Sequence, residues 1–595
     1  MMLALLLFAA GLAPQADTAP SAPLVDYRIE ASLDESTHVL TGRARVKYVN
    51  RSESSIDTLW FHQHLNAFRP NSAWARRELE YGERRFQDLG PDDHAFERFT
   101  GVTVGGQAVS PAYPGAPDST VVGIPLPSPL RPGDSVEVRL DWQARLSVIP
   151  RRQGRRGRHY DWAQWYPRIA VYEDGKWQTQ PLLPQGEFYG EFASYDVTLE
   201  VQDDQVFGAT GVPVEGDPGW EQAAVPGTGE VLYLRDTYPE KPAEPLGLLS
   251  GEPAQGRKRV RWRAQDVHHF AWSIDPNYRF EQGTVPRLGG SGAEEIAIRV
   301  LYLPEDTAWD EGVAVRRTQD ALVWLQELWG PYLWPQLTNL HRIEGGGTEF
   351  PMLVMNGSAS QGLIIHEVGH QYLHGMLANN EWREGWLDEG FQSFIDGWAA
   401  EEGGADTWQP SMHAIRQLEA MGRTQPIATP GAEFADPEIY SQMTYTKPSL
   451  VLRMLRELVG DDIMREILRE YFRRNALSHV SEQDLREVVD EVTGKSYDWF
   501  FDQWVHTTAT LDFAVANART ERTSDGRWRT VATIRREGEA WMPVEVAVDG
   551  ERVDLTGRER EQTVEVITPS RPQAVVVDPE EVLLDINPAN NRRRL

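Results

Sequence analysis

The chain has 595 residues, a formal net charge of −30 at pH 7, 41% hydrophobic residues and no cysteine. This length is too great for one hydrophobic core, so several domains are expected, and the apolar content excludes a globally disordered chain. The charge argues against nucleic acid or an anionic membrane surface as a partner, and the absence of cysteine excludes disulfides, thiolate zinc ligands and a lipid on an N-terminal cysteine.

The first segment, 1–23, opens with an apolar run from Met1 to Ala13 and continues into a stretch rich in Pro, Ala and Ser. Such a short run followed by small residues is typical of a secretory signal peptide. No positive charge precedes it and Ala16 is the best candidate cleavage site, so a misassigned start or an uncleaved anchor stays open. We expect export to the periplasm or the medium, and otherwise a cytoplasmic protein. No later segment is apolar enough to cross a membrane.

From 24 to 299 the hydrophobic pattern has a period of two. Val136, Val138 and Leu140 alternate with charged residues, and Pro and Gly turns separate similar segments. This pattern predicts a large antiparallel β domain packed on one face. For the locally basic insert 151–158, the pattern favours a mobile, solvated loop over a binding role.

Helical spacing takes over near Thr307 and indicates a second domain, 300–510. Leu322, Leu325 and Leu328 lie on one apolar helix face that is expected to end at Gly330. Later helices are expected at 449–459, 461–473 and 481–492.

The last segment, 511–595, returns to strands. Val544, Val546 and Val548 alternate with other residues, and Asp-Gly pairs at 525–526 and 549–550 are strong hairpin signals. A small β-sandwich is therefore expected here. The predicted fold class is multidomain α+β: an antiparallel β domain, a mostly helical domain and a β-sandwich, in that order.

The helical domain carries the motif His366-Glu-x-x-His370, followed after 18 residues by Glu389. On a helix, His366 and His370 stand at i and i+4 and point toward one ion. Glu367 lies about 100° further round, where it suits a general base acting on a metal-bound water. Three protein ligands and an open position are typical of catalytic zinc. A core helix with two hydrogen-bonded histidines is the alternative, which the apolar lead-in and the following turn disfavour.

Two further segments offer side chains to this site. Upstream, the run Gly-Gly-Gly-Thr-Glu at 345–349 combines glycines, which permit close approach of another chain, with the carboxylate of Glu349. Downstream, Tyr445 stands at the expected start of a helix, where its phenol could donate to a developing oxyanion. Taken alone, each signal is weak, because a glycine-rich run is usually a loop and a tyrosine is usually packing.

The chain resembles the aminopeptidase N family of gluzincin metallopeptidases, which also includes the leukotriene-forming epoxide hydrolase. The resemblance rests on the zinc signature, on 346–350 in place of the family's Gly-x-Met-Glu-Asn motif, on Tyr445 in a Tyr-x-Lys context, and on the domain order. It implies a saddle-shaped β domain, a thermolysin-like catalytic domain and a small β-sandwich. It also implies one zinc ion bound by His366, His370 and Glu389.

The resemblance further implies a zinc aminopeptidase that cuts the first peptide bond of peptides with a free N-terminus. Glu349 would bind the α-amine, and Gly346 and Gly347 would bind the peptide backbone. Gln164, in Ala-Gln-Trp-Tyr-Pro, resembles the glutamine that the family's β domain sends into the site. In catalysis, Glu367 would take the proton of the zinc-activated water, and Tyr445 would hold the oxyanion.

Three departures from the family pattern affect these expectations. Thr348 and Phe350 replace the usual Met and Asn, which puts the preferred N-terminal side chain in doubt. Pro448 replaces a Gly and should alter the start of a helix more than the chemistry. The chain ends after the β-sandwich, where many relatives continue into a large helical domain, so this short form is expected to have a more open cavity.

Two other functions stay open at this point. A thermolysin-like endopeptidase would share the zinc ligands but has no need of Glu349 at an amine site. A non-catalytic binding protein on the same fold is the other alternative, which the intact catalytic positions disfavour. No residue demands an epoxide hydrolase activity.

Overall fold

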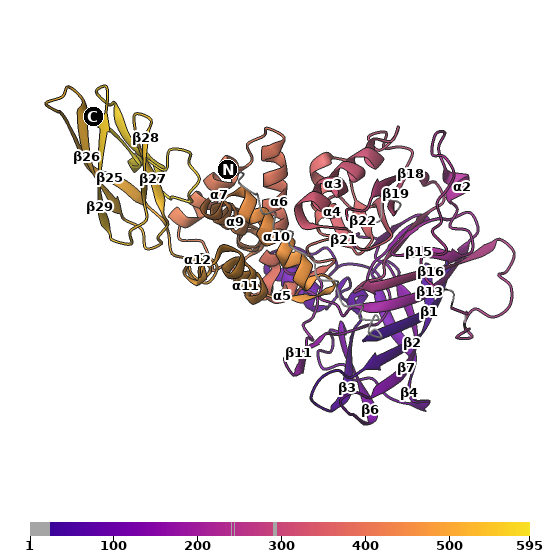
Figure 1. The fold of residues 1–595 in the computed structure, drawn as a ribbon. Helices are drawn as coiled ribbons and strands as arrows, with labels where there is room; N and C mark the ends of the chain where they lie inside the picture. Colours follow the sequence, from indigo (N-terminus) through magenta and orange to yellow (C-terminus); the bar gives the residue numbers. More distant parts are fainter. Residues whose placement is uncertain (1–23, 240, 243, 290–293) are drawn as a thin grey trace, which may run out of the picture.

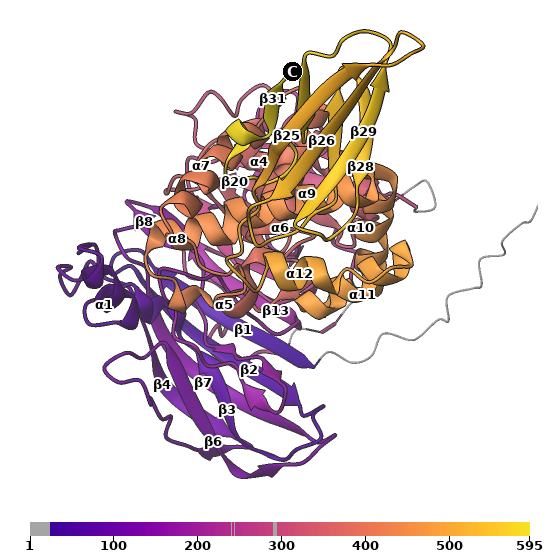
Figure 2. The same ribbon diagram turned by 90° about the vertical axis from the view of Figure 1, so that its left-hand side faces the viewer.

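The computed structural model describes residues 24–239, 241–242, 244–289 and 294–595. Figure 1 shows two β-rich parts at opposite ends with a mostly helical part between them, and Figure 2 shows the same order after a turn of 90°. The multidomain α+β fold class is therefore confirmed. The expected signal peptide, 1–23, lies outside the described residues.

The N-terminal part is built on an eight-stranded sheet. The strands with the period-two pattern pair antiparallel, as predicted, and their side chains are buried alternately. One pair differs: the first strand runs parallel to the strand that begins at Ala193, because the chain passes through other sheets before it returns to this edge. The strand order is β15 (Val212–Glu215), β16 (Arg257–Val267), β13 (Ala193–Gln202), β1 (Val25–Asp34), β2 (Val39–Val49), β7 (Ser135–Arg145), β4 (Phe96–Val104), β5 (Gln107–Ala108).

A four-stranded sheet joins this part to the central one. Its core is a stack of Trp162 on Trp272, with ring centroids 5.5 Å apart. Asp161 accepts a hydrogen bond from the N–H of Ile343 at 2.9 Å, which ties the sheet to the central part. The strands are β14 (Val206–Ala209), β17 (Trp272–Asp275), β9 (His159–Trp162) and β8 (Gly154–Arg156).

The central part contains a mixed five-stranded sheet in the order β18 (Arg279–Pro286), β19 (Glu295–Tyr302), β20 (Gln336–His341), β22 (Leu353–Asn356), β21 (Gly347–Phe350). The predicted domain boundary between residues 299 and 300 falls inside β19, so it lies too far along the chain. A strand cannot be divided between domains, and β18 pairs with β19 along its whole length, so this sheet begins at Arg279. β21 is the last strand of the sheet, so one of its edges has no partner strand within the described ranges.

The helices of the central part follow the predicted pattern. The first long helix ends at Gly330, and the helix after Ser481 begins with a capping box, in which Ser481 and Asp484 satisfy each other's backbone N–H groups. The helices that surround the site are α3 (Val313–Trp329), α4 (Gln361–Gly369), α5 (Glu381–Glu384), α6 (Glu389–Glu402), α9 (Lys447–Val459), α10 (Asp461–Asn475) and α11 (Glu482–Thr493). Across the described ranges, no helix has the length and apolar content needed to span a bilayer.

The C-terminal part consists of two small sheets, as expected for a β-sandwich. Asp549 and Gly550 both have positive φ angles, 52° and 90°, which is the backbone of a tight two-residue hairpin turn. The carbonyl of Asp585 accepts a hydrogen bond from Arg416 at 2.6 Å, which attaches the sandwich to the helices. The strands are β25 (Phe513–Arg522), β26 (Trp528–Arg536) and β29 (Glu561–Thr568) in one sheet, and β28 (Glu551–Leu555), β27 (Val544–Val548), β30 (Ala574–Val577) and β31 (Arg592–Arg594) in the other.

Candidate active site

Two helices bring the predicted zinc ligands together. His366 lies in the last turn of α4 and His370 directly after it, with their Nε2 atoms 3.1 Å apart. Glu389 opens α6, and its Oε2 lies 3.4 Å from His366 Nε2 and 3.2 Å from His370 Nε2. Among the described residues, this buried Oε2 has no hydrogen-bond donor. Two imidazole nitrogens and an orphaned carboxylate oxygen facing one point fit a zinc ion.

Two aspartates hold the outer nitrogens of these imidazoles. Asp396 Oδ2 lies 2.7 Å from His366 Nδ1, and Asp388 Oδ1 lies 2.6 Å from His370 Nδ1. Such outer partners orient the rings so that the Nε2 lone pairs face the metal. Burial lowers the pKa of His370, but Asp388 and Glu389 outweigh it and raise that pKa well above its usual value. The site therefore favours positive charge. Neither aspartate was predicted from the sequence, although Asp388 adjoins the ligand Glu389.

Glu367 lies beside the triad and is buried, with 4% of its surface exposed. Burial, reinforced by the charge of Glu349, raises its pKa to about 7 against the opposing effect of the two histidines. Its carboxylate packs on Gly347 of β21, where a Cβ would overlap the Glu367 oxygens. Glycine is required at this position because the Glu367 carboxylate occupies the space that a side chain would take.

Gly347→Ala is therefore expected to displace the Glu367 carboxylate and to lower kcat at least tenfold, while the zinc content stays unchanged. Steady-state kinetics and metal analysis check this result. Gly345→Ala is the matched control, because a Cβ at Gly345 meets nothing within 4 Å. Equal activity of the two variants would contradict the packing argument.

Tyr445 approaches the triad from a third element. It lies in η4 (Gln442–Thr446), a π-helical turn that leads into α9, and π-turns in helices often mark functional sites. Its hydroxyl donates to Glu389 Oε1 at 2.6 Å. Burial and the charge of Glu389 raise its pKa well above the usual value, so the phenol keeps its proton. Pro448, at the start of α9, packs against Gly390, which positions this turn against α6.

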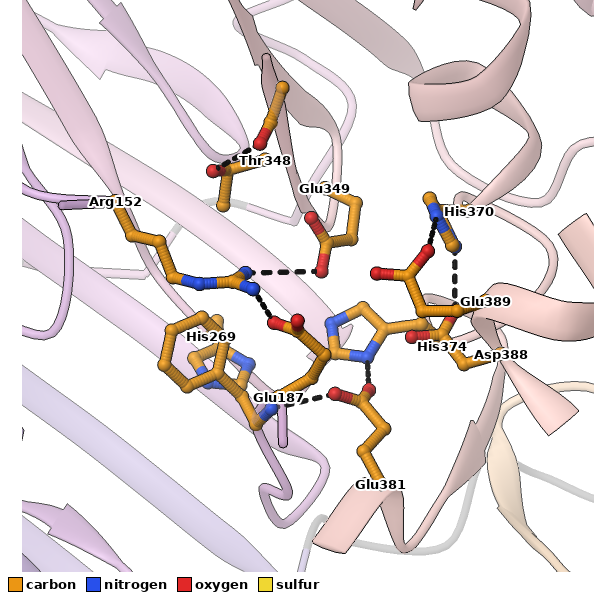
Figure 3. A network of polar contacts seen from close by, with 12 residues as sticks. Arg152, Glu187, His269, Thr348, Glu349, His370, His374, Glu381, Asp388 and Glu389 are labelled. Atoms are coloured by element: carbon orange, nitrogen blue, oxygen red, sulfur yellow. Dashed lines mark hydrogen bonds and ion pairs between the residues drawn. The ribbon is translucent and has the colours of Figure 1, made fainter. Parts of the chain in front are cut away.

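Glu349 lies on β21 with 4% of its surface exposed, and Arg152 Nη1 is 3.6 Å from its Oε1. Arg152 also forms an ion pair with Glu187. Oxygens of Glu187, Glu349 and Glu389 lie within 4.8 Å of one another, so three carboxylates share one small volume (Figure 3). This volume adjoins the zinc triad, and Glu389 belongs to both.

The expectation that 151–158 forms a solvated loop is wrong for Arg152. Its guanidinium is buried 5.0 Å from the ring centroid of Phe188, where the carboxylates of Glu187 and Glu349 attract it. Its basic surroundings in an acidic chain were the signal that could have identified it. Glu187 carried no such signal, since it lies in a loop far from every motif.

The other predicted site residues lie close by. Gln164 Oε1 accepts a hydrogen bond from His64 Nδ1 at 3.1 Å, and His64 stacks on Phe188, so Gln164 is linked to Arg152 through two side chains. Gly346 has φ +73° and its carbonyl accepts the N–H of Gly357. Thr348 and Phe350 are the two residues that depart from the family's motif. Thr348 contacts Arg342, and Phe350 packs near Phe188.

Two histidines of one helical segment and a glutamate that opens the next helix, beside a mixed sheet, define the gluzincin class of zinc metallopeptidases. Residues 354–504 match the Peptidase family M1 domain. In this domain and in its fold the chain is similar to the aminopeptidase N-like gluzincins, and its two histidines and glutamate fit a zinc ion.

Aminopeptidase N of Oryctolagus cuniculus is 28% identical over 140 residues, which are 21% of this chain and 14% of that protein. The puromycin-sensitive aminopeptidase of Caenorhabditis elegans is 24% identical over 233 residues, which are 35% of this chain and 24% of that protein. The matched region thus spans about a quarter or less of these relatives' length.

Solved structures share the fold over a larger part of the chain. Aminopeptidase A of Legionella pneumophila, in complex with aspartic acid, covers 95% of this chain and 60% of its own, with a TM-score of 0.64 and 13% identity. The M1 zinc metallopeptidase of Deinococcus radiodurans covers 82% of this chain and 94% of its own, with a TM-score of 0.54 and 18% identity.

Proposed function

We propose that this protein is a zinc-dependent aminopeptidase that hydrolyses the N-terminal bond of peptides. The observation that carries the proposal is the buried carboxylate of Glu349, which shares one volume with Glu187 and with the zinc ligand Glu389. A cationic α-amine is the part of a peptide that such a volume would attract. A ligand held there would place its first peptide bond near the triad. A mutant of the M1 zinc metallopeptidase from Deinococcus radiodurans, whose fold this chain shares, has been crystallised bound to a Tyr-Ser-Ala substrate.

His366, His370 and Glu389 would hold the zinc ion. When bound, zinc supplies Lewis acidity, which lowers the pKa of a water molecule and polarises a carbonyl group. Glu367 would take the proton of the attacking water and later deliver it to the leaving amine. Its pKa of about 7 suits both directions of that transfer.

Other residues of the chain would position the peptide and its transition state. Tyr445, whose phenol stays protonated, would donate a hydrogen bond to the oxyanion. β21 offers a free strand edge on which an extended peptide can pair. The carbonyls of Gly346 and Gly347 accept hydrogen bonds from the Gly357 N–H and the Thr348 hydroxyl, so a peptide backbone bound by these glycines would share those carbonyls. Gln164 would act indirectly, through His64.

Hydrolysis of a panel of aminoacyl fluorogenic substrates, with chelation and zinc add-back, tests the proposal. We expect hydrolysis that chelation abolishes and zinc restores, and a strong preference for a peptide with a free amine over its N-acetylated form. Equal rates on the two peptides would favour an endopeptidase. No hydrolysis of any substrate by the zinc-loaded protein would favour a binding protein.

Tyr445→Phe is expected to lower kcat by about 10²–10³-fold with little change in KM, because the lost hydrogen bond forms in the transition state. The measurement is steady-state kinetics on the best substrate of the panel. Tyr440→Phe is the matched control, since Tyr440 is a neighbouring tyrosine whose ring centroid lies 6.5 Å from that of Tyr445. A Tyr445→Phe variant with normal kcat would remove the tyrosine from the mechanism.

A further inference from the structure

Three buried histidines meet behind the site, where the N-terminal part touches the central one. His268 and His269 lie in the turn between β16 and β17, and His374 lies four residues after His370. One ring nitrogen of each lies within 4.8 Å of a ring nitrogen of the other two, and each is at most 3% exposed. Figure 3 shows the His374 ring between Glu187 and Glu389, and His269 on the other side of Glu187.

The contacts among these rings differ from those of an ordinary hydrogen-bonded cluster. His268 Nε2 lies 2.9 Å from the carbonyl oxygen of His374, so that nitrogen carries the proton and His268 Nδ1 presents a lone pair. This Nδ1 lies 2.5 Å from His269 Nδ1. His269 Nε2 is buried without a hydrogen-bond partner among the described residues. Two facing imidazole nitrogens are also the feature that His366 and His370 show at 3.1 Å in the zinc triad.

A buried carboxylate lies beside one of the three histidines. Glu381, the first residue of α5, is 1% exposed and forms an ion pair with His374 Nδ1, while its other oxygen accepts the Phe188 N–H at 2.6 Å. Its charged neighbours include Glu349 and Glu389, which have the same sign. A buried carboxylate with like-charged neighbours is costly unless a cation lies beside it.

The cationic groups near this cluster are two arginines. Arg152 forms ion pairs with Glu187 and Glu349, and Arg168 donates to the carbonyl of Tyr189 at 3.1 Å. Neither lies within 4.0 Å of a Glu381 oxygen in the part of the chain that the structure describes. Neither arginine therefore neutralises Glu381, whose basic partner is His374.

We propose that His268, His269 and His374 form a second metal site, for a divalent transition-metal ion of the zinc class. Three imidazole nitrogens within 4.8 Å of one another suit such an ion. Glu381, which is paired with His374, would act as an outer partner that holds this ring in place. The ion would join the turn between β16 and β17 to the segment that follows α4, and so hold the two parts of the molecule together behind Glu349.

Metal counting on the full chain tests this inference. The metal-stripped protein is reloaded with Zn²⁺ alone, desalted and analysed by mass spectrometry. We expect two ions per chain, one in His366→Ala/His370→Ala and one in His269→Phe/His374→Phe. His62→Phe is the matched control, since His62 is also a buried histidine, bonded to the Gln178 carbonyl, and it should keep two ions.

The variant without the triad histidines makes the outcome independent of the proposed activity. One ion in that variant supports the second site whatever the enzyme hydrolyses, and no ion overturns it. Should the His269 variant fail to fold, the same triad variant is heated with and without Zn²⁺. A rise of several degrees in its Tm supports the site, and an unchanged Tm overturns it. X-ray absorption on this variant should show three imidazole nitrogens at about 2.0–2.1 Å.

Discussion

Glu367→Gln is expected to lower kcat by about 10²–10⁴-fold while the chain keeps its zinc. Glutamine preserves the size of the side chain but removes the carboxylate that accepts the proton of the attacking water. Glu367 contributes no atom to the ligand group of His366, His370 and Glu389, so metal affinity should not change. Steady-state kinetics and metal analysis of the same preparation measure the two effects.

The control for this experiment is Glu97→Gln. Glu97 is also a buried carboxylate whose oxygens have no hydrogen-bond partner among the described residues, but it lies on β4 in the N-terminal part. Burial raises the pKa of both carboxylates, so both substitutions should leave the fold intact. Near-normal kcat in Glu367→Gln would remove Glu367 as the general base, and loss of zinc would instead give it a structural role at the metal.

Glu349→Gln is expected to lower kcat/KM for a peptide with a free N-terminus by roughly 30- to 900-fold, equivalent to about 2–4 kcal/mol. The carboxylate is buried, so its ion pair with the substrate amine would form with little screening by water. The N-acetylated peptide has no charged amine, and its slow hydrolysis should change far less. The selectivity between the two peptides is therefore the quantity to measure.

Glu344→Gln provides the matched comparison. Glu344 lies five residues upstream in the same segment and contacts Arg151 at 3.6 Å, whereas Glu349 contacts Arg152. Glu344→Gln should keep the selectivity for the free amine. If Glu349→Gln kept it as well, the amine would be bound by other groups, with Glu187 as the next candidate because its oxygens lie in the same volume.

Local sequence patterns determined several helix ends and the arrangement of the two histidines in this protein. α3 ends at Gly330 and the helix after Ser481 starts with its capping box because these signals act within a few residues. His366 and His370 face one point for the same reason, since the helix repeat alone sets their spacing. Glu389 joins them from α6, which begins after an intervening segment that contains α5.

Only the tertiary structure decided which distant residues meet. Arg152 pairs with Glu187 and Glu349, and His268 meets His374, although about a hundred residues or more separate several of these partners. The parallel pairing of β1 with β13 and the start of the central sheet at Arg279 depend on long-range pairing of the same kind. Periodicity shows which side of an element is buried but not which element covers it. The metal triad, Glu367 and Glu349 could therefore be predicted from the sequence, whereas Arg152 and Glu187 beside them could not.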